Sequence, residues 1–207
     1  ALLISLMALG IKKGDEVITA ANTAIPTISA IINAGATPKL VDIDDDYLID
    51  LKKIQKEINS KTKVIIPVHL YGQSCQMDKL LKIAKKNRLK VVEDCAQAQG
   101  AKFKKKYLGN YGDFGCFSFY PTKILGAYGD GGFITTKNFE LYKKIKRLRF
   151  YGIETLDKKN KFFNKYYSNE NGVNSRLDEI QATILNFKIK KLKYSISRRR
   201  NLALMYK

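Results

Sequence analysis

KVIIPVHLYGQSCQMDKLLKIAKKNRLKVVEDC occupies residues 63–95, and its pattern decides the fold class. Residues 63–70 and 89–95 are rich in Val, Ile and Leu without strict alternation, which is typical of strands buried on both faces. Between them, residues 79–87 have a helical pattern, and Asp78 is a residue type that commonly caps a helix. A strand, a helix and a second strand in this order predict a βαβ unit with parallel strands.

The same alternation extends outward from this unit in both directions. It predicts further strands at 15–20, 38–44, 114–120 and 132–136, and further helices at 26–35, 51–59 and 139–150. We therefore predict an α/β fold with a mostly parallel sheet and helices on both of its faces. Residues 151–173 are polar and aromatic, and we expect a long loop there, of the kind that is usually functional or mobile.

The last part of the chain has a different pattern. Asn174 or Ser175 is expected to cap a long helix that starts at Arg176 and carries one apolar stripe of Leu177, Ile180, Ile184 and Phe187. We predict a cofactor-binding large domain at 1–173, whose N-terminal start is missing, and a long helix at 174–207 leading into a truncated small domain. The apolar opening segment resembles the end of a helix more than a signal peptide, so we expect the chain to begin inside a longer protein.

The composition favours some partners over others. The net charge is +19, from 38 Lys and Arg against 19 Asp and Glu. Nucleic-acid binding, attraction of an anionic substrate and solvated helix faces would each explain it. The lysines are spread through helical segments such as 79–90 and 185–193, which favours solvated faces and no nucleic-acid partner. No apolar run approaches the roughly 20 residues that span a membrane.

Cysteine and histidine usage disfavours a metal centre. The three cysteines lack metal-ligand spacing, and the chain has one histidine. One histidine is too few for a typical histidine-based metal site and leaves a single candidate for a Ser-His-Asp triad. An odd number of cysteines without metal-ligand spacing fits reduced thiols in a cytoplasmic protein.

Polar side chains follow two predicted strands, where ligands of open α/β sheets bind. Asp94 and Gln97 follow one strand, and Ser118 and Lys123 follow another, just before the glycine-rich segment 126–132. Asp94 alone could be a helix cap, and Lys123 alone a surface lysine beside a tight turn. Together they match a pyridoxal phosphate site, which needs a lysine for the cofactor and an aspartate for its pyridinium nitrogen. We predict that pairing.

VVEDCAQAQGA at 91–101, FSFYPTKILGAYGDGG at 117–132 and NSRLDEIQATIL at 174–185 carry a family resemblance. They resemble the DegT-type nucleotide-sugar aminotransferases, which are pyridoxal-phosphate-dependent and adopt the aspartate aminotransferase fold. The resemblance extends along nearly the whole chain. It implies that Lys123 binds the cofactor covalently and shuttles the proton, and that Asp94 contacts the pyridine nitrogen.

The resemblance also implies roles for several other residues. Gln97 matches a residue that contacts the cofactor ring or its hydroxyl, and Ser118 matches a phosphate-binding serine. Asn174 matches an asparagine that reaches the phosphate of the neighbouring subunit's cofactor, which implies a homodimer with a shared active site. Tyr120 and Tyr151 match positions near the sugar; for Tyr151, simple packing is the alternative.

Several activities remain open within the resemblance. FSFYPTK followed by GDGG resembles members that aminate C3 of a dTDP-3-keto-6-deoxyhexose with L-glutamate as amino donor, for deoxyamino-sugar and surface glycan biosynthesis. Amination at C4 is the alternative within the family. The related sugar dehydratases carry a histidine in place of the lysine, so Lys123 disfavours a dehydratase. A non-catalytic protein that senses sugars or binds nucleic acid is a further alternative.

Overall fold

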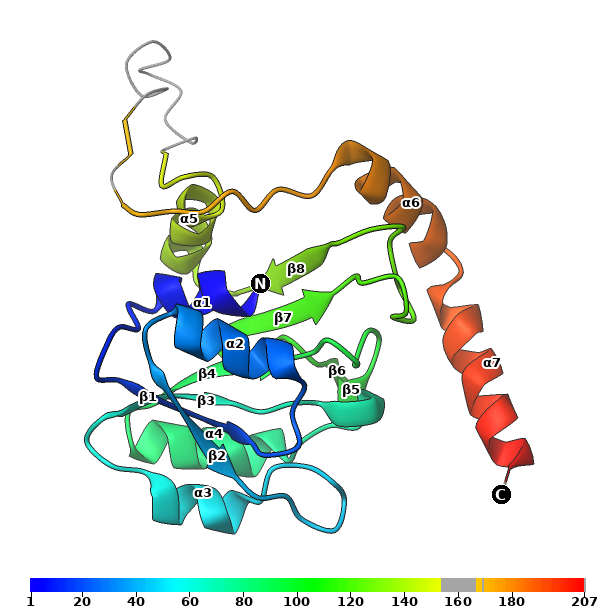
Figure 1. Cartoon of the computed structure of the whole chain (residues 1–207). Coiled ribbons are helices and arrows are strands. Elements are labelled where there is room, and N and C mark those ends of the chain that lie inside the picture. Colours follow the sequence, from blue (N-terminus) through cyan, green and yellow to red (C-terminus); the bar gives the residue numbers. More distant parts are fainter. Residues whose placement is uncertain (154–166, 169, 207) are drawn as a thin grey trace.

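The computed structural model describes residues 1–153, 167–168 and 170–206, and the described part is built around one six-stranded sheet (Figure 1). The strand order is β2-β1-β3-β4-β7-β8. Neighbours from β2 to β7 are parallel, and β8 pairs antiparallel with β7. In this order the strands are β2 (Thr37–Val41), β1 (Glu16–Ala20), β3 (Thr62–Ile66), β4 (Lys90–Asp94), β7 (Phe114–Ser118) and β8 (Gly132–Thr135).

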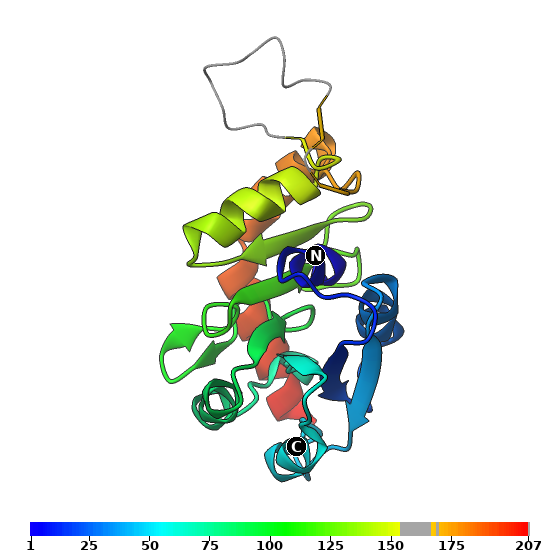
Figure 2. The same cartoon turned by 90° about the vertical axis from the view of Figure 1, so that its left-hand side faces the viewer.

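Helices cover both faces of the sheet, as predicted (Figures 1 and 2). One face packs against α1 (Leu2–Ala8), α2 (Ile25–Asn33) and α5 (Phe139–Leu148), and the other against α3 (Leu51–Glu57) and α4 (Met77–Lys86). In β1, Val17 faces the first core and its neighbour Ile18 faces the second. Because both faces are buried, successive strand residues are apolar, and this is why the strands lack polar alternation.

The sequence prediction missed the short 3₁₀ helix η1 (Leu70–Gly72) and a small hairpin. Strands β5 (Lys102–Phe103) and β6 (Lys106–Tyr107) form a two-stranded antiparallel hairpin. Its turn residues Lys104 and Lys105 have φ angles of 43° and 68°. Turns of this kind are normally predicted from an Asn-Gly or Asp-Gly pair, and two lysines do not indicate one.

Helix starts agree with the prediction in one case and differ in another. Asp50 caps α3, since its carboxylate accepts a hydrogen bond from the Lys52 N–H at 2.7 Å. The predicted cap at Asp78 is wrong, because α4 begins at Met77 after Gln76. Met77 is the first residue of the helix and is fully buried in the core. Asp78 therefore lies inside the first turn and not at the cap.

The C-terminal part also departs from the prediction of one long helix from Arg176. Helix α6 (Glu179–Ile189) starts after Asp178, and α7 (Leu192–Met205) follows a break. Asn174 therefore caps no helix; it pairs with Phe150 as an isolated antiparallel bridge. An apolar stripe of this kind serves either a core or an interface, and the core is not what it serves in the described residues, because Ile180 is 73% exposed and Leu185 is the buried residue of α6.

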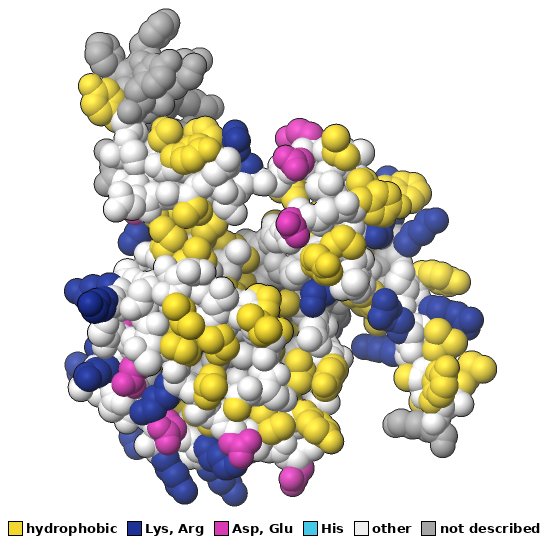
Figure 3. Space-filling view, viewed as in Figure 1, with side chains coloured by type: hydrophobic (Ala, Val, Ile, Leu, Met, Phe, Trp, Pro, Cys, Tyr) yellow, Lys and Arg dark blue, Asp and Glu magenta, His cyan; other side chains and the backbone are white. Residues whose placement is uncertain are grey.

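On the face in Figure 3, Lys and Arg side chains are scattered over the outer helices and along the C-terminal helix, not gathered in one stripe. Hydrophobic side chains lie among them on α6 and α7. Within the described ranges, no helix combines the length and the apolar character that a membrane span requires. Much of the predicted loop at 151–173 lies outside the described residues.

Candidate active site

One cleft lies beyond the carboxyl ends of the parallel strands, as the α/β topology predicts. The carboxyl end of β4 supplies Asp94 and the turn after it supplies Gln97. The carboxyl end of β7 supplies Ser118, and the following turn supplies Lys123. Asp94 and Lys123 are 29 positions apart in the sequence. Because they follow two neighbouring strands, they line a single cleft.

Asp94 is 5% exposed and its carboxylate is held by two donors. The Ala96 N–H donates to Oδ1 at 3.0 Å, and the Thr27 hydroxyl donates to Oδ2 at 2.8 Å. The alternative that Asp94 caps a helix does not apply, since the residues after it form turns. A carboxylate has about four lone-pair sites. Each oxygen therefore keeps a site for a further donor on a ligand in the cleft.

Lys123 lies half-buried in the turn after β7, and its N–H donates to the Tyr120 carbonyl at 2.9 Å. Among the residues that the structure describes, none forms a hydrogen bond or ion pair with its Nζ. The turn is tight: a Cβ added at Gly126 would lie 2.5 Å from the Pro121 carbonyl oxygen. A residue with a side chain would displace this turn, and Lys123 with it.

Helix α6 holds the glycine-rich segment that follows Lys123. The Tyr128 N–H donates to Gln181 Oε1 at 2.8 Å, and Lys188 Nζ donates to the Gly126 carbonyl. Sequence analysis did not single out Gln181 or Lys188, because nothing in a helical pattern shows which loop the helix touches. The contacts make α6 a support for the lysine turn.

Gln97 and Ser118 each keep donors that could serve a ligand. Gln97 Oε1 accepts a hydrogen bond from the Tyr71 N–H at 2.8 Å, which leaves its amide N–H groups available. Ser118 Oγ accepts from the Tyr120 N–H at 3.3 Å, so the hydroxyl proton can be donated elsewhere. Tyr120 also lines the cleft and is 52% exposed.

The structure separates the two remaining predicted residues. Asn174 lines the cleft of its own chain, and its Oδ1 accepts from Arg176 Nε at 3.1 Å. Tyr151 is not among the residues that line the cleft. Its ring packs at 5.6 Å from the Phe150 ring, and its N–H donates to the Val173 carbonyl. Tyr151 is 46% exposed, and its predicted place near the sugar stays a prediction.

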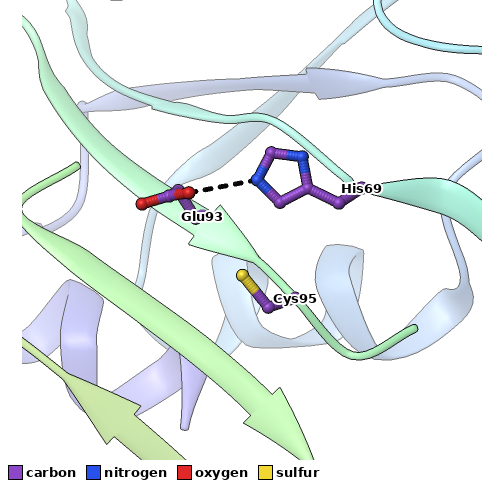
Figure 4. Close-up of side chains that lie close together, drawn as sticks. All are labelled: His69, Glu93 and Cys95. Carbon is purple, nitrogen blue, oxygen red and sulfur yellow. Dashed lines mark hydrogen bonds and ion pairs between the residues drawn. The ribbon is translucent and has the colours of Figure 1, made fainter. Parts of the chain in front are cut away.

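His69, Glu93 and Cys95 form a buried cluster (Figure 4), but it lacks the free ligand sites of a metal centre. His69 Nδ1 accepts from the Cys75 N–H, so Nε2 carries the ring proton and donates to Glu93 at 3.2 Å. Glu93 also accepts from three backbone N–H groups at 2.7–2.9 Å, those of Gly109, Tyr111 and Gly112. Its four lone-pair sites are filled.

Burial and hydrogen bonding oppose each other at Glu93. Burial raises its pKa, but the hydrogen bonds from His69 and from the Gly112 and Gly109 N–H groups together lower the pKa below its ordinary value of 4.5. The charged form is therefore the one that the fold stabilises. Burial raises the pKa of Cys95, so its thiol is not a ready metal ligand.

Glu93→Gln should lower the free energy of unfolding at pH 7 by about 3 kcal/mol, since an amide N–H₂ would then face N–H donors in a buried site. A lowered folded pKa gives stability that is full above the ordinary pKa of 4.5 and is lost as the pH falls through the folded value. Urea unfolding should therefore show that the free energy of unfolding falls less between pH 7 and pH 4 in Glu93→Gln than in wild type. The exposed Glu140→Gln is the control, and equal losses in Glu93→Gln and wild type would contradict the assignment.

Comparison with known proteins identifies the family of the chain. The DegT/DnrJ/EryC1/StrS aminotransferase family matches residues 1–207. The chain belongs to this family. It is 50% identical over 207 residues, all of the chain and 54% of the relative, to dTDP-3-amino-3,6-dideoxy-alpha-D-galactopyranose transaminase of Aneurinibacillus thermoaerophilus. The chain spans about half the length of the curated relatives it matches.

Solved structures of the family share the fold. S. venezuelae DesV in complex with a ketimine intermediate has a TM-score of 0.91 and 39% identity, over 99% of this chain and 53% of that one. NtdA from Bacillus subtilis with bound cofactor PMP has a TM-score of 0.85 and 38% identity, over 95% of this chain and 42% of that one. The fold is thus that of the pyridoxal-phosphate-dependent sugar aminotransferases, as expected.

The residues of the cleft fit pyridoxal phosphate. Its aldehyde needs a primary amine, and Lys123 offers one that the described residues leave unpaired. Its pyridine nitrogen, when protonated, needs a buried acceptor, and Asp94 is a carboxylate with open lone-pair sites. Ser118 adds a hydroxyl donor in the same cleft for an anionic group.

Proposed function

We propose that the whole protein transfers the amino group of L-glutamate to C3 of a dTDP-linked 3-keto-6-deoxyhexose, for deoxyamino-sugar and surface glycan biosynthesis. The observation that carries this proposal is the unpaired Lys123 amine in one cleft with the held Asp94 carboxylate. The C3 position is supported by FSFYPTK with GDGG, and by the name of the Aneurinibacillus relative.

Each cleft residue has a definite task in this reaction. Lys123 Nζ would hold the cofactor covalently and, once the amino donor has taken its place, would move the proton at the reacting carbon. Asp94 keeps the proton on the pyridine nitrogen. When bound, the cofactor supplies the ring that accepts the electron pair of the broken bond. Gln97 contacts the ring or its hydroxyl, Ser118 binds the phosphate, and Tyr120 lies beside the sugar.

The proposal includes a homodimer with a shared active site, and Asn174 as a phosphate ligand across the subunit boundary. The exposed position of Asn174 at the cleft leaves it accessible to a second chain. The exposed apolar residues of α6, such as Ile180 and Phe187, are consistent with burial in a larger assembly.

One assay separates the proposed activity from its alternatives. We expect full-length protein with pyridoxal phosphate and L-glutamate to aminate a dTDP-3-keto-6-deoxyhexose, with the product identified by mass spectrometry and NMR. Amination of only the 4-keto sugar would overturn the C3 assignment. No product from either sugar, together with tight and salt-dependent DNA binding and no cofactor uptake, would replace the enzyme with a binding protein.

A further inference from the structure

We propose that Thr27 is a positioning residue for Asp94, and that its hydroxyl fixes the carboxylate that receives the cofactor's pyridine nitrogen. The proposal rests on the proposed function, since it concerns the same cleft. Thr27 lies in the first turns of α2, 67 positions before Asp94 in the sequence. The hydroxyl of Thr27 has two hydrogen-bond partners, Asp94 and Thr23.

The direction of the hydrogen bonds follows from the chemistry of the groups. An ionised carboxylate can only accept, so the Thr27 hydroxyl must donate its one proton to Asp94 Oδ2, at 2.8 Å. Thr27 Oγ1 can then only accept from Thr23, whose hydroxyl lies 2.8 Å away. The two threonines form a chain of donors that ends on the carboxylate, and such chains strengthen each member.

The Thr27 side chain is shielded from solvent, which gives this bond its importance. Thr27 is 1% exposed and Asp94 is 5% exposed. If the hydroxyl is removed, a charged acceptor loses a donor on its buried side. Asp94 would then be held only at Oδ1, by the Ala96 N–H.

Two donors from different segments fix the plane of the carboxylate, whereas one leaves it free to rotate. Ala96 follows β4 and donates to Oδ1, whereas Thr27 belongs to α2 and donates to Oδ2. With its plane fixed, the carboxylate of Asp94 keeps its open lone-pair sites available to a ligand in the cleft, which Thr27 and Ala96 also help to line. The pyridine nitrogen would then meet an acceptor that needs no reorganisation, which is the condition for strong electrostatic stabilisation.

The test compares two substitutions of Thr27 in the full-length protein. Thr27→Val keeps the shape and removes the hydroxyl, and Thr27→Ser keeps the hydroxyl and removes the methyl group. We expect Thr27→Val to raise the dissociation constant of pyridoxal phosphate from the apoprotein by about tenfold, the effect of losing one hydrogen bond to a charged group. Thr27→Ser should stay within about threefold of wild type, a partial loss that the missing packing explains.

Three further readouts separate positioning from simple stability. We expect kcat to fall about tenfold in Thr27→Val, with the KM for L-glutamate nearly unchanged, because the amino donor does not contact Asp94. Thr19→Val is the matched control, since Thr19 is also fully buried and its hydroxyl donates to the Ile66 carbonyl at 3.0 Å, outside the cleft. The control should lower the melting temperature of the apoprotein but leave the cofactor affinity unchanged.

The outcomes are distinct. Equal weakening by Thr27→Val and Thr27→Ser, or weakening by neither, would overturn the proposal while wild type still binds cofactor. Equal weakening by Thr19→Val would also overturn it, since the effect would then follow stability alone. Absence of cofactor binding by the wild-type protein would instead overturn the proposed function, and this inference with it.

Discussion

Lys123→Ala in the full-length protein is expected to abolish the visible absorption of lysine-bound pyridoxal phosphate and to lower kcat by about 10⁴-fold, the upper end of the range for a lost general acid–base group. The reason is that Lys123 follows the carboxyl end of β7 in the cleft that contains Asp94, and no described residue pairs with its amine. Without it, the cofactor has no covalent attachment at this position, and no group remains there to move the proton.

The control and the contrary result are both simple. Lys82→Ala removes an exposed lysine of α4, outside this cleft, and should leave absorption and turnover unchanged. A small primary amine added to Lys123→Ala should restore part of the turnover, because it can take over the proton transfer. An intact absorption band in Lys123→Ala would show that another lysine holds the cofactor.

The sequence predicted the sheet well because burial on both faces leaves a strong local signal. In 63–95, the unbroken apolar runs around a helical pattern are enough to place β3, α4 and β4. The C-terminal helices show the opposite case. The predicted stripe contains Ile180, which is 73% exposed, so apolar spacing there did not correspond to a core and did not locate the helix start or the break after Ile189.

The candidate site was predictable where it depends on strand ends and not where it depends on contacts between distant segments. Asp94 and Ser118 are the last residues of their strands, so topology alone brings them to one edge. Thr27 and Gln181 reach the site through hydrogen bonds that span 67 and 53 positions. A threonine in a helix and a glutamine in a helix have no local feature that indicates such a partner.

Asp94→Asn is expected to lower kcat by roughly a thousandfold, because a buried charge pair loses one partner at a cost of about 3–5 kcal/mol. A neutral amide provides little stabilisation of a protonated pyridine nitrogen, so the ring becomes a poorer electron acceptor. Cofactor affinity should fall with turnover, and both are measurable in the full-length protein. The exposed Asp45→Asn, far from the cleft residues in the sequence and outside its lining, should change neither.

The stability of the apoprotein should respond in a different way. In the described residues, Asp94 has two neutral donors and no cation as an ion-pair partner, so its burial costs desolvation that no positive charge offsets. The new amide can also donate to the Thr27 hydroxyl, whose proton can turn to Thr23, an exchange that the backbone N–H donors around Glu93 do not allow. Asp94→Asn should therefore leave the melting temperature of the apoprotein unchanged or raise it, while turnover is nearly lost. A lower melting temperature with normal turnover would mean that Asp94 serves the fold and not the cofactor. The contrast follows from the position itself: a charge held by Thr27 and Ala96 in a buried site is costly until a protonated ring arrives.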